Sequence, residues 1–511
     1  MANFRIFVEK QLKYNVEAKQ LLSSLNQNLN LNLKSLRIIN IYDVFNITTE
    51  ELELAKYVVF AEPSVDVLST QAEELLTNTW FAIEPLPGQY DQRADSALQA
   101  LNLLAINDPN LSIKTGKLLI FSQELTLDQL EQIKRYYINP LEMCAKDLNV
   151  LQADLQANNF AAVPIYTEFN QLDASKLADF RSNHGLAMTN ADLCCVQDYF
   201  KQIEQRNPTE TEIKVLDTYW SDHCRHTTFE THLTDITIQQ GMYQNLFNDT
   251  LANYLTSREM VHAEKLEFKP ITLMDLATIC GKQLKKQGKL TLVEETDEIN
   301  ACSLIVDIEV DSRPQKWSLQ FKNETHNHPT EIEPYGGAST CVGGAIRDPL
   351  SGRSYVYQAM RISGAADPLE KIEDTLVGKL PQKTITVKAA HGFSSYGNQI
   401  GLATTHVREI YHPGYKAKRM EVGMVVAAAP YTNIRRDQPC AGDVIILLGG
   451  KTGRDGCGGA TGSSKEHDVN SAAQCGAEVQ KGNPVVERKI QRLFRRSEEH
   501  TSELQSRQCI S

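Results

Sequence analysis

Residues 321–348 concentrate more ionisable side chains than an ordinary core strand can enclose. The segment FKNETHNHPTEIEPYGGASTCVGGAIRD contains a lysine, an arginine, two histidines, several carboxylates and two pairs of glycines. Removing such groups from water is unfavourable unless they pair with one another, with a metal ion or with a ligand. We therefore expect this stretch to form the wall of a functional site.

Composition restricts the class of protein and its partners. The chain has 511 residues, 41% hydrophobic and 23% charged, which is typical of a globular protein with roughly three to four domains. The net charge of -12 argues against nucleic acid or an anionic membrane as the main partner. No apolar run approaches the about 20 residues of a membrane helix, and the charged N-terminus does not resemble a signal peptide. Because the eleven cysteines lack any Cys-x-x-Cys spacing, we expect a cytoplasmic protein.

The hydrophobic pattern predicts several domains. Residues 1–150 alternate strand-like and helix-like stretches, which indicates a small α+β domain with a scaffold or docking role. Residues 151–219 are expected to form a helical linker, in which Thr209 and Glu212 fit a capping box. From residue 220 onward, strands alternate with helices and glycine-rich turns, which is typical of an α/β or α+β domain. Its predicted strands cover residues 306–310, 317–322, 384–387 and 444–448.

The residues that follow Phe321 could bind a metal ion or act as a base. Glu324, His326 and His328 are spaced by two, so they would share one face of a strand. A carboxylate beside imidazoles can hold a divalent ion, or one imidazole can accept a proton. The alternative is a hydrogen-bonded strand that leads into a tight turn and has no ligand.

The next part of this segment suggests a phosphate site. The pairs Gly336-Gly337 and Gly343-Gly344 would let backbone N–H groups approach phosphate oxygens closely. Arg347 can bind a phosphate through two N–H groups, and Asp348 is a suitable ligand for Mg²⁺.

Residues 222–226, Asp-His-Cys-Arg-His, allow three interpretations. His223 could be a base positioned by Asp222, or His223, Cys224 and His226 could bind zinc. The absence of a Cys-x-x-Cys or His-x₃-His partner pair disfavours zinc, and a purely structural helix end is the third reading. The glycine-rich residues 453–464 are predicted to form a loop that either binds phosphate or lies at the surface, and residues 394–401 are predicted to form a turn.

Together these segments resemble the formylglycinamide ribonucleotide amidotransferases, or FGAM synthases, in their large single-chain form. The resemblance extends from about residue 200 to residue 494, and the first 150 residues resemble the family's small N-terminal domain more loosely. The segments that carry it are Arg206–Thr209, Trp220–Phe229, Phe321–Pro329, Gly336–Asp348, Tyr396–Asn398 and Gly453–Gly456.

The resemblance implies a ligase of purine biosynthesis that forms a C–N bond with glutamine as the amide donor. In this reaction ATP phosphorylates the amide oxygen of formylglycinamide ribonucleotide. Ammonia released from glutamine then displaces phosphate, which gives the amidine, ADP and phosphate. The implied fold is a duplicated synthetase core related to aminoimidazole ribonucleotide synthetase. Residues 220–430 would be the N-terminal subdomain of its first half, and residues 431–494 would begin the C-terminal subdomain.

The family motifs assign roles to residues of this chain. His223 and His326 are the acid–base candidates, and Glu324 and Asp348 would hold Mg²⁺. The substrate ribonucleotide would meet Thr325, Asn327, His328 and Arg347. The ATP site would be lined by Lys322, Gly337, Ala338, Ser339, Thr340, Cys341, Val342, Gly343, Gly344, Ala345, Ile346, Arg347 and Asp348. Tyr396, Gly397 and Asn398 would make weaker contacts with the nucleotide.

The chain departs from the family in its extent. A second synthetase half and a glutaminase domain, the source of ammonia, have no counterpart here, so we expect a fragment. Residues 495–511 lose all periodicity and are expected to be a non-native tail. Two alternatives remain open. One is a catalytically inactive nucleotide-binding module. The other is a different synthetase of the superfamily, such as aminoimidazole ribonucleotide or selenophosphate synthetase, although those lack the long N-terminal domain.

Overall fold

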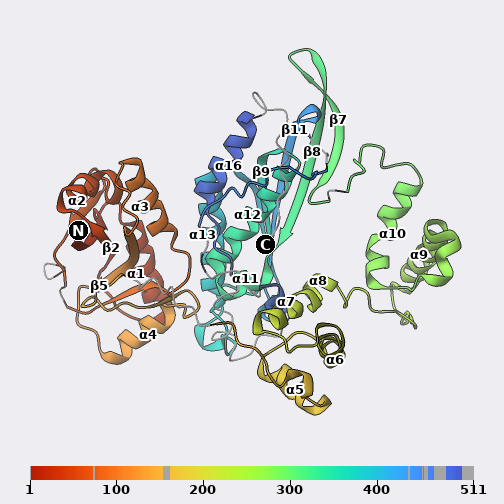
Figure 1. The fold of residues 1–511 in the computed structure, drawn as a ribbon, viewed down its shortest axis with the longest axis horizontal. Helices are drawn as coiled ribbons and strands as arrows, with labels where there is room; N and C mark the ends of the chain where they lie inside the picture. The colour runs from red at the N-terminus through yellow and green to blue at the C-terminus, as the bar shows by residue number, and fades with distance from the viewer. Residues whose placement is uncertain are drawn as a thin grey trace.

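The chain forms an N-terminal α+β domain, a group of linker helices, a pair of longer helices and a second α+β unit (Figure 1). The computed structural model describes residues 2–72, 75–76, 78–153, 162–297, 299–434, 438–451, 453, 459–464 and 479–497. For residues 460 and 495–497 it describes the backbone alone. The mixed α+β class expected from the sequence is confirmed.

The N-terminal domain is built on a six-stranded antiparallel sheet in the order β3-β1-β2-β5-β4-β6. Buried side chains on one face of the sheet, such as Ile38 and Val44, pack against the four helices of the domain. A capping box at Thr48 begins the second of these helices. The elements are β1 (Ala2–Lys10), α1 (Val16–Leu29), β2 (Leu36–Ile47), α2 (Thr49–Ala55), β3 (Asp66–Ser69), β4 (Trp80–Pro85), α3 (Gln92–Leu103), β5 (Ser112–Phe121), α4 (Leu127–Tyr137) and β6 (Met143–Ala145).

Three linker helices surround one small apolar cluster, and a fourth, single-turn helix follows them and leads towards the second sheet. They are α5 (Ala174–Asn183), α6 (Asn190–Tyr199), α7 (Glu210–Trp220) and the single turn α8 (Asp222–Arg225). The predicted capping box at Thr209 is confirmed, because its side chain accepts from the N–H of Glu212 and the Glu212 carboxylate accepts from the N–H of Thr209. Helix α7 therefore places α8, which carries His223, at its C-terminal end.

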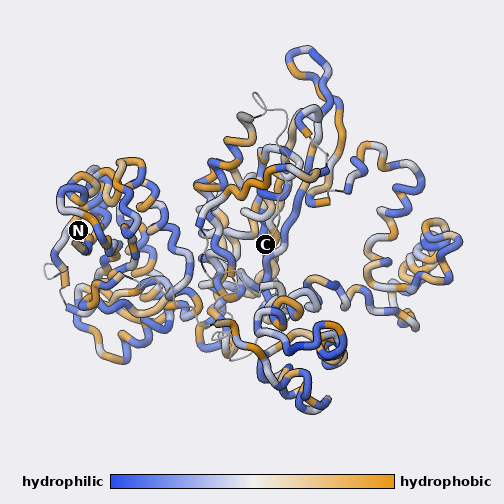
Figure 2. The backbone as a smooth tube through the Cα atoms, in the orientation of Figure 1, coloured by the Kyte–Doolittle hydropathy of each residue, from blue (hydrophilic) through white to orange (hydrophobic). Residues whose placement is uncertain are grey.

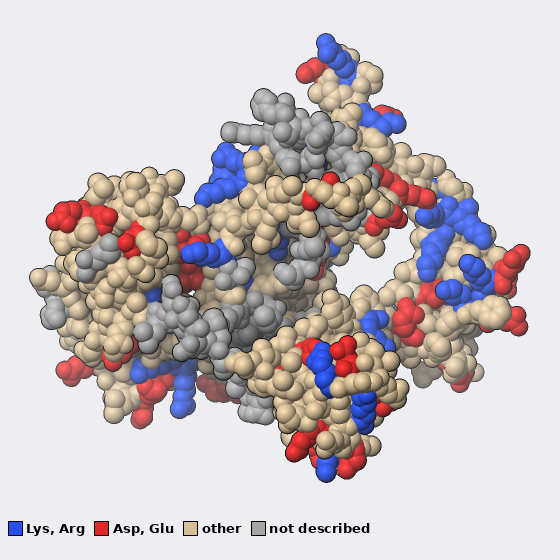
Figure 3. Space-filling model, in the orientation of Figure 1, with Lys and Arg blue, Asp and Glu red and all other residues tan. Residues whose placement is uncertain are grey.

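Helices α9 (Gln244–His262) and α10 (Leu273–Lys286) form a pair that Figure 1 shows set apart from the second sheet. Asp275 holds the pair together, because its carboxylate accepts from Tyr254, Arg258 and His262. Lysines of α10 gather on the face shown in Figure 3. Figure 2 shows hydrophilic and hydrophobic residues alternating along the helices, and no helix in the described part of the chain is long and apolar enough to cross a membrane.

The second α+β unit has a five-stranded sheet in the order β10-β9-β11-β8-β7. All neighbouring strands are antiparallel except β9 and β10, whose parallel connection contains α13. The strands are β7 (Cys302–Val310), β8 (Arg313–Thr325), β9 (Tyr355–Ala365), β10 (Thr404–Tyr411) and β11 (Met420–Pro430). One face carries α11 (Asn327–Ile332), α12 (Pro334–Ser351) and α13 (Gln382–Ile400), and α16 (Pro484–Ser497) packs against α12 and α13 (Figure 1).

Several predicted elements differ from the structure. The glycine-rich stretch after Glu333 is the helix α12, not a tight turn. Residues 384–387 and 394–400 both belong to α13, and Gly401 is its C-cap. Within the helix, Ile385, Ala389 and Phe393 recur every fourth residue on the buried face. The apolar residues 444–448 form no strand and are exposed in the structure. Of the predicted loop 453–464, residues 459–463 form the short helix α14, and residues 454–458 lie outside the described residues. Residues 498–511 of the predicted tail also lie outside the described residues.

Glycines allow α12 to lie unusually close to its neighbours. A Cβ atom on Gly337 would stand 2.4 Å from the backbone nitrogen of Thr330 in α11. On Gly343 it would stand 2.7 Å from the ring of Tyr396 in α13. Small residues in this helix thus serve close packing, which is why a segment rich in glycine is helical despite its low helix propensity.

We predict that Gly337→Ala destabilises the fold, because backbone atoms of α11 cannot move aside as a flexible side chain can. Overpacking of this kind costs about 1–3 kcal/mol. Gly281→Ala in α10 is the matched control, since nothing lies within 4 Å of its Cβ position and the change should stabilise by roughly 0.5–1 kcal/mol. Urea unfolding followed by circular dichroism should shift the midpoint down for the first variant and up for the second. Equal shifts would contradict this account.

Candidate functional site

The end of β8 and the C-terminal half of α12 bring together a lysine and two carboxylates. Lys322 and Glu324 lie two residues apart on β8 and point to the same side. The ammonium of Lys322 is 2.6 Å from the Asp348 carboxylate and 3.5 Å from that of Glu324. Burial lowers the pKa of Lys322, but Asp348 and Glu324 outweigh this effect and leave that pKa raised. Burial raises the pKa of Glu324.

His326 follows directly after β8 and is held as a neutral imidazole. Its Nδ1 lies 2.7 Å from the carbonyl oxygen of Gly337, which can only accept, so Nδ1 carries the proton. The other ring nitrogen, Nε2, is then available to accept one. Burial lowers the pKa of His326 to about 4, so the ring is neutral near pH 7.

The predicted common strand face of Glu324, His326 and His328 is wrong. Strand β8 ends at Thr325, and the chain turns into α11, which buries His328. The side-chain oxygen of Asn327 accepts from the backbone N–H of Glu421 in β11 and so fixes the start of α11. Of the residues expected to meet the ribonucleotide in this stretch, Thr325 alone is exposed.

The second histidine segment lies near the first. The backbone N–H of His223 donates to Ser464 Oγ at 2.9 Å, next to α14, and α14 also packs against α11. Burial lowers the pKa of His223, and the charge of His223 contributes to the lowered pKa of His326. The histidines predicted as acid–base candidates therefore share one electrostatic neighbourhood.

Asp222 does not position His223, which was one of the three interpretations of this segment. Its carboxylate accepts from Thr227 Oγ1 and from the N–H and hydroxyl of Thr228, which closes the turn after α8. Among the residues that the structure describes, no three His, Cys, Asp or Glu side chains converge as a metal site, so His223, Cys224 and His226 do not form one.

Arg347 is held by two residues that lie far away in the sequence. Its Nη1 is 2.9 Å from the carboxylate of Glu487 in α16 and 3.3 Å from the hydroxyl of Tyr396 in α13. Tyr396 also donates to Glu487 and is 1% exposed. Gly397 and Asn398 continue α13, and the exposed Asn398 side chain donates to Ser394 rather than joining this cluster. No motif pointed to Glu487, because it lies in a helix with ordinary surface composition.

Backbone groups of the glycine-rich stretch do not form a phosphate cradle. Residues Gly337–Ile346 lie inside α12, where N–H groups bond to the preceding turn. The N-terminus of α12 is occupied by Glu333, which accepts from the N–H of Gly336 and pairs with Lys481. The nucleotide contacts predicted for this stretch would therefore have to come from its side chains.

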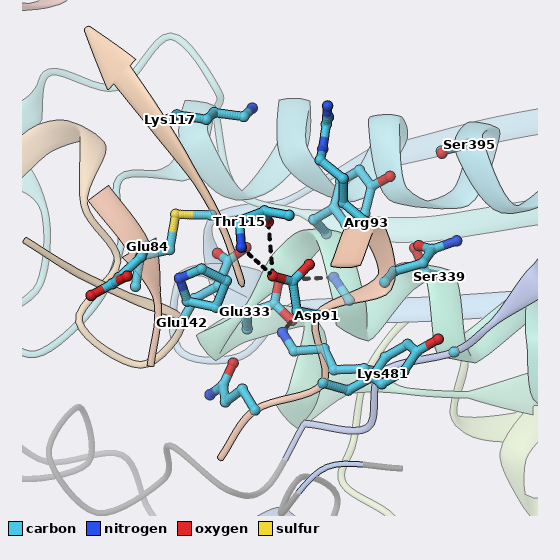
Figure 4. Close-up of a pocket in the computed structure, with 18 of the residues that line it drawn as sticks. Glu84, Asp91, Arg93, Thr115, Lys117, Glu142, Glu333, Ser339, Ser395 and Lys481 are labelled. Atoms are coloured by element: carbon cyan, nitrogen blue, oxygen red, sulfur yellow. Dashed lines mark hydrogen bonds and ion pairs between the residues drawn. The ribbon is translucent and has the colours of Figure 1, made fainter. Parts of the chain in front are cut away.

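A cavity of about 210 Å³ lies between the N-terminal domain and the second α+β unit (Figure 4). Asp91 and Glu142 line it from the first, and Glu333 and Lys481 from the second. It adjoins the N-terminal part of α12 at Tyr335, Gly336 and Ser339, whereas Asp348 lies nine residues beyond Ser339, about 14 Å along the helix axis. The cavity is therefore separate from the cluster around Lys322.

Comparisons with known proteins support the resemblance seen in the sequence. A family model described as the formylglycinamide ribonucleotide amidotransferase linker domain matches residues 177–226. Phosphoribosylformylglycinamidine synthase subunit PurL of Methanopyrus kandleri is 33% identical over 181 residues, which are 34% of this chain and 23% of that protein. Its counterpart in Picrophilus torridus is 26% identical over 303 residues, 59% of this chain and 32% of that protein.

Among solved structures, "T. maritima PurL complexed with FGAR" is 20% identical and covers 59% of this chain and 37% of that chain, with a TM-score of 0.36. The relationship therefore rests on the sequence matches, by which parts of the chain are similar to FGAM synthases. The chain spans about a quarter to a third of the length of these curated relatives.

We predict that the neutral state of His326 makes stability depend on pH. Folding lowers the pKa from 6.5 to about 4, so the unfolded chain binds more protons between these values. The stabilisation is complete above about pH 6.5 and is lost as the pH falls towards 4, by up to about 1.4 kcal/mol per pH unit. Unfolding free energies measured without divalent ions should show this slope, and His326→Asn should reduce it. An NMR titration of His326 with a midpoint near 6.5 would contradict the prediction.

Proposed function

We propose that this chain carries the first synthetase half of a formylglycinamide ribonucleotide amidotransferase. The cluster around Lys322 would bind the phosphates of ATP and support phosphorylation of the amide oxygen of formylglycinamide ribonucleotide. The observation that carries the proposal is the contact of Lys322 with Glu324 and Asp348. The neutral His326 lies four residues beyond Lys322, where it is hydrogen-bonded to Gly337 of α12, the helix that carries Asp348. The curated relatives, which are phosphoribosylformylglycinamidine synthases, support the same reaction.

The site suits phosphoryl transfer, in which an enzyme mainly positions its reactants and neutralises charge. Lys322 and Arg347 both supply positive charge that acts on the Glu324 carboxylate. In the first step an oxygen–phosphorus bond forms at the amide oxygen and ADP leaves. In the second step, the nitrogen of ammonia forms a bond to the amide carbon, the C–O bond breaks, and the oxygen leaves as part of phosphate. The glutamine-derived ammonia would come from a glutaminase outside this chain.

His326 is the better placed of the two acid–base candidates. Its Nδ1 proton is directed to Gly337, so Nε2 can take the proton that the attacking ammonia must lose. His223 would act beside it, because its lowered pKa also favours the neutral ring. Exposed Thr325 would contact the ribonucleotide, and the enclosed Asn327 and His328 would shape the wall behind it.

Glu324 and Asp348 fit the requirements of Mg²⁺, which favours oxygen ligands and is often held by one or two carboxylates together with substrate phosphates. Burial raises the pKa of Glu324, so a nearby cation would favour its charged form. When bound there, Mg²⁺ would neutralise charge on the transferred phosphoryl group.

We predict that Lys322→Met weakens binding of ATP in the presence of magnesium by about tenfold or more. Loss of one charged hydrogen bond to phosphate is worth about 1.5–3 kcal/mol. Lys316→Met is the matched control, because Lys316 lies exposed on the same strand, six residues away. Isothermal titration calorimetry on the chain would measure both affinities. Equal affinities for the two variants would remove Lys322 from the phosphate site.

We predict that His326→Ala lowers ammonia-dependent ADP formation by ~10²-fold or more while changing affinity for the ribonucleotide only a few-fold. The assay uses ammonium chloride as nitrogen donor, in an enzyme where this chain is continued to the length of its relatives. His223→Ala in parallel divides the roles of the two histidines, and His412→Ala, at an exposed position, is the control. A normal kcat would exclude His326 as the base. Nucleotide binding without turnover in the unmutated enzyme would favour a nucleotide-binding module instead.

A further inference from the structure

Arg347, Tyr396 and Glu487 form a cluster contributed by three helices, α12, α13 and α16. Tyr396 and Glu487 are buried, with exposed fractions of 1% and 6%, while the Arg347 side chain keeps 31% of its surface exposed. One carboxylate oxygen of Glu487 accepts from both Arg347 Nη1 and the Tyr396 hydroxyl. The other carboxylate oxygen is buried without a hydrogen-bond partner among the described residues. Two buried groups thus converge on one nitrogen of a partly exposed arginine.

The ring of Tyr396 is held in a slot that two glycines create. A Cβ atom on Gly343 would stand 2.7 Å from the phenol carbon and hydroxyl, and one on Gly482 would stand 2.7 Å from the ring edge. Any side chain at either position would collide with the ring. The hydroxyl of Tyr396 therefore has a fixed place, and it fixes the carboxylate of Glu487 in turn.

The guanidinium of Arg347 faces the candidate site with its other nitrogens. A Cβ atom on Gly344 would lie 3.9 Å from Arg347 Nη2 and 3.7 Å from the Glu324 side chain, so Nη2 is on the side of Glu324. The charge of Arg347 also acts on Glu324 and on His326. Nη1 is engaged by Glu487 and by the hydroxyl of Tyr396.

We propose that Glu487 and Tyr396 are positioning residues that hold Arg347 so that Nη2 faces Glu324 and can donate to a phosphate oxygen. This inference rests on the proposed function. An unrestrained arginine samples many rotamers, and ordering it on binding weakens affinity. A guanidinium already fixed by one nitrogen avoids that loss, and its planar shape then directs the remaining N–H groups. Glu487 does not touch the ligand in this account and acts only through Arg347.

The test measures ATP affinity, in the presence of magnesium, for Glu487→Gln and Tyr396→Phe. Each variant should bind roughly tenfold more weakly than the unmutated chain. In an Arg347→Ala background, Glu487→Gln should add less than about twofold, because the residue through which it acts is gone. Tyr396→Phe keeps the ring in its slot, so it remains informative if Glu487→Gln reduces the yield of folded protein.

A matched control lies in the pair of helices α9 and α10. Arg258, Asp275 and Tyr254 form a second buried arginine–carboxylate–tyrosine cluster, with the Tyr254 hydroxyl 2.8 Å from the Asp275 carboxylate. Asp275→Asn should lower the thermal unfolding midpoint without changing ATP affinity.

The outcomes separate the two proposals. An unmutated chain that does not bind ATP would reject the proposed function and the ligand role of Arg347 with it. Binding that Glu487→Gln and Tyr396→Phe leave unchanged would reject the positioning role alone. The same would follow if Glu487→Gln weakened binding equally with and without Arg347, because its effect would then be structural.

Discussion

Close packing of α12 against its neighbours is the constraint on which the candidate site depends. The helix touches α11 at Gly337 and α13 at Gly343, where no side chain larger than hydrogen fits. Because interiors are dense and resist deformation, these contacts fix both the rotation and the depth of the helix. Asp348, further along, is thereby placed under the end of β8 within reach of Lys322. Residues that are chemically inert thus determine where the charged ones meet.

The carboxylates at the two ends of α12 stand in opposite relations to the helix dipole. Glu333 caps the N-terminus, where negative charge is stabilised, and Lys481 balances it. Asp348 is in the opposite situation, since it is 4% exposed and lies in the last turn, where the dipole disfavours a carboxylate. Lys322 offsets this effect in the structure. A buried carboxylate at a helix C-terminus is stabilised by any nearby positive charge. A cation bound to phosphate would be stabilised at this position for the same reason.

Local features were predictable from the sequence, and features set by distant partners were not. The capping box at Thr209 was predicted because both of its partners lie within three residues. The mixed α+β class followed from the alternation of strands and helices. Residues 384–387 were misread because β-branched residues favour strands in isolation, whereas burial every fourth residue selects a helix. Asp222 was assigned to His223 by adjacency, but nearby threonine donors hold it instead.

The N-terminal domain bears on the site through hydrogen bonds at the end of α11 and just before α16. Asn139 of the N-terminal domain donates to the carbonyl oxygen of Ile332 at the end of α11. Asn483, just before α16, donates to the hydroxyl of Tyr90, which precedes α3. Asn483 also accepts from the N–H of Val486 and so fixes the first turn of α16. That turn carries Glu487, whose partner Arg347 lies 140 residues earlier in the chain. The domain therefore contacts the chain at the end of α11 and at the start of α16. The motif in residues 321–348 includes Arg347, but the residues that hold Arg347 lie outside it.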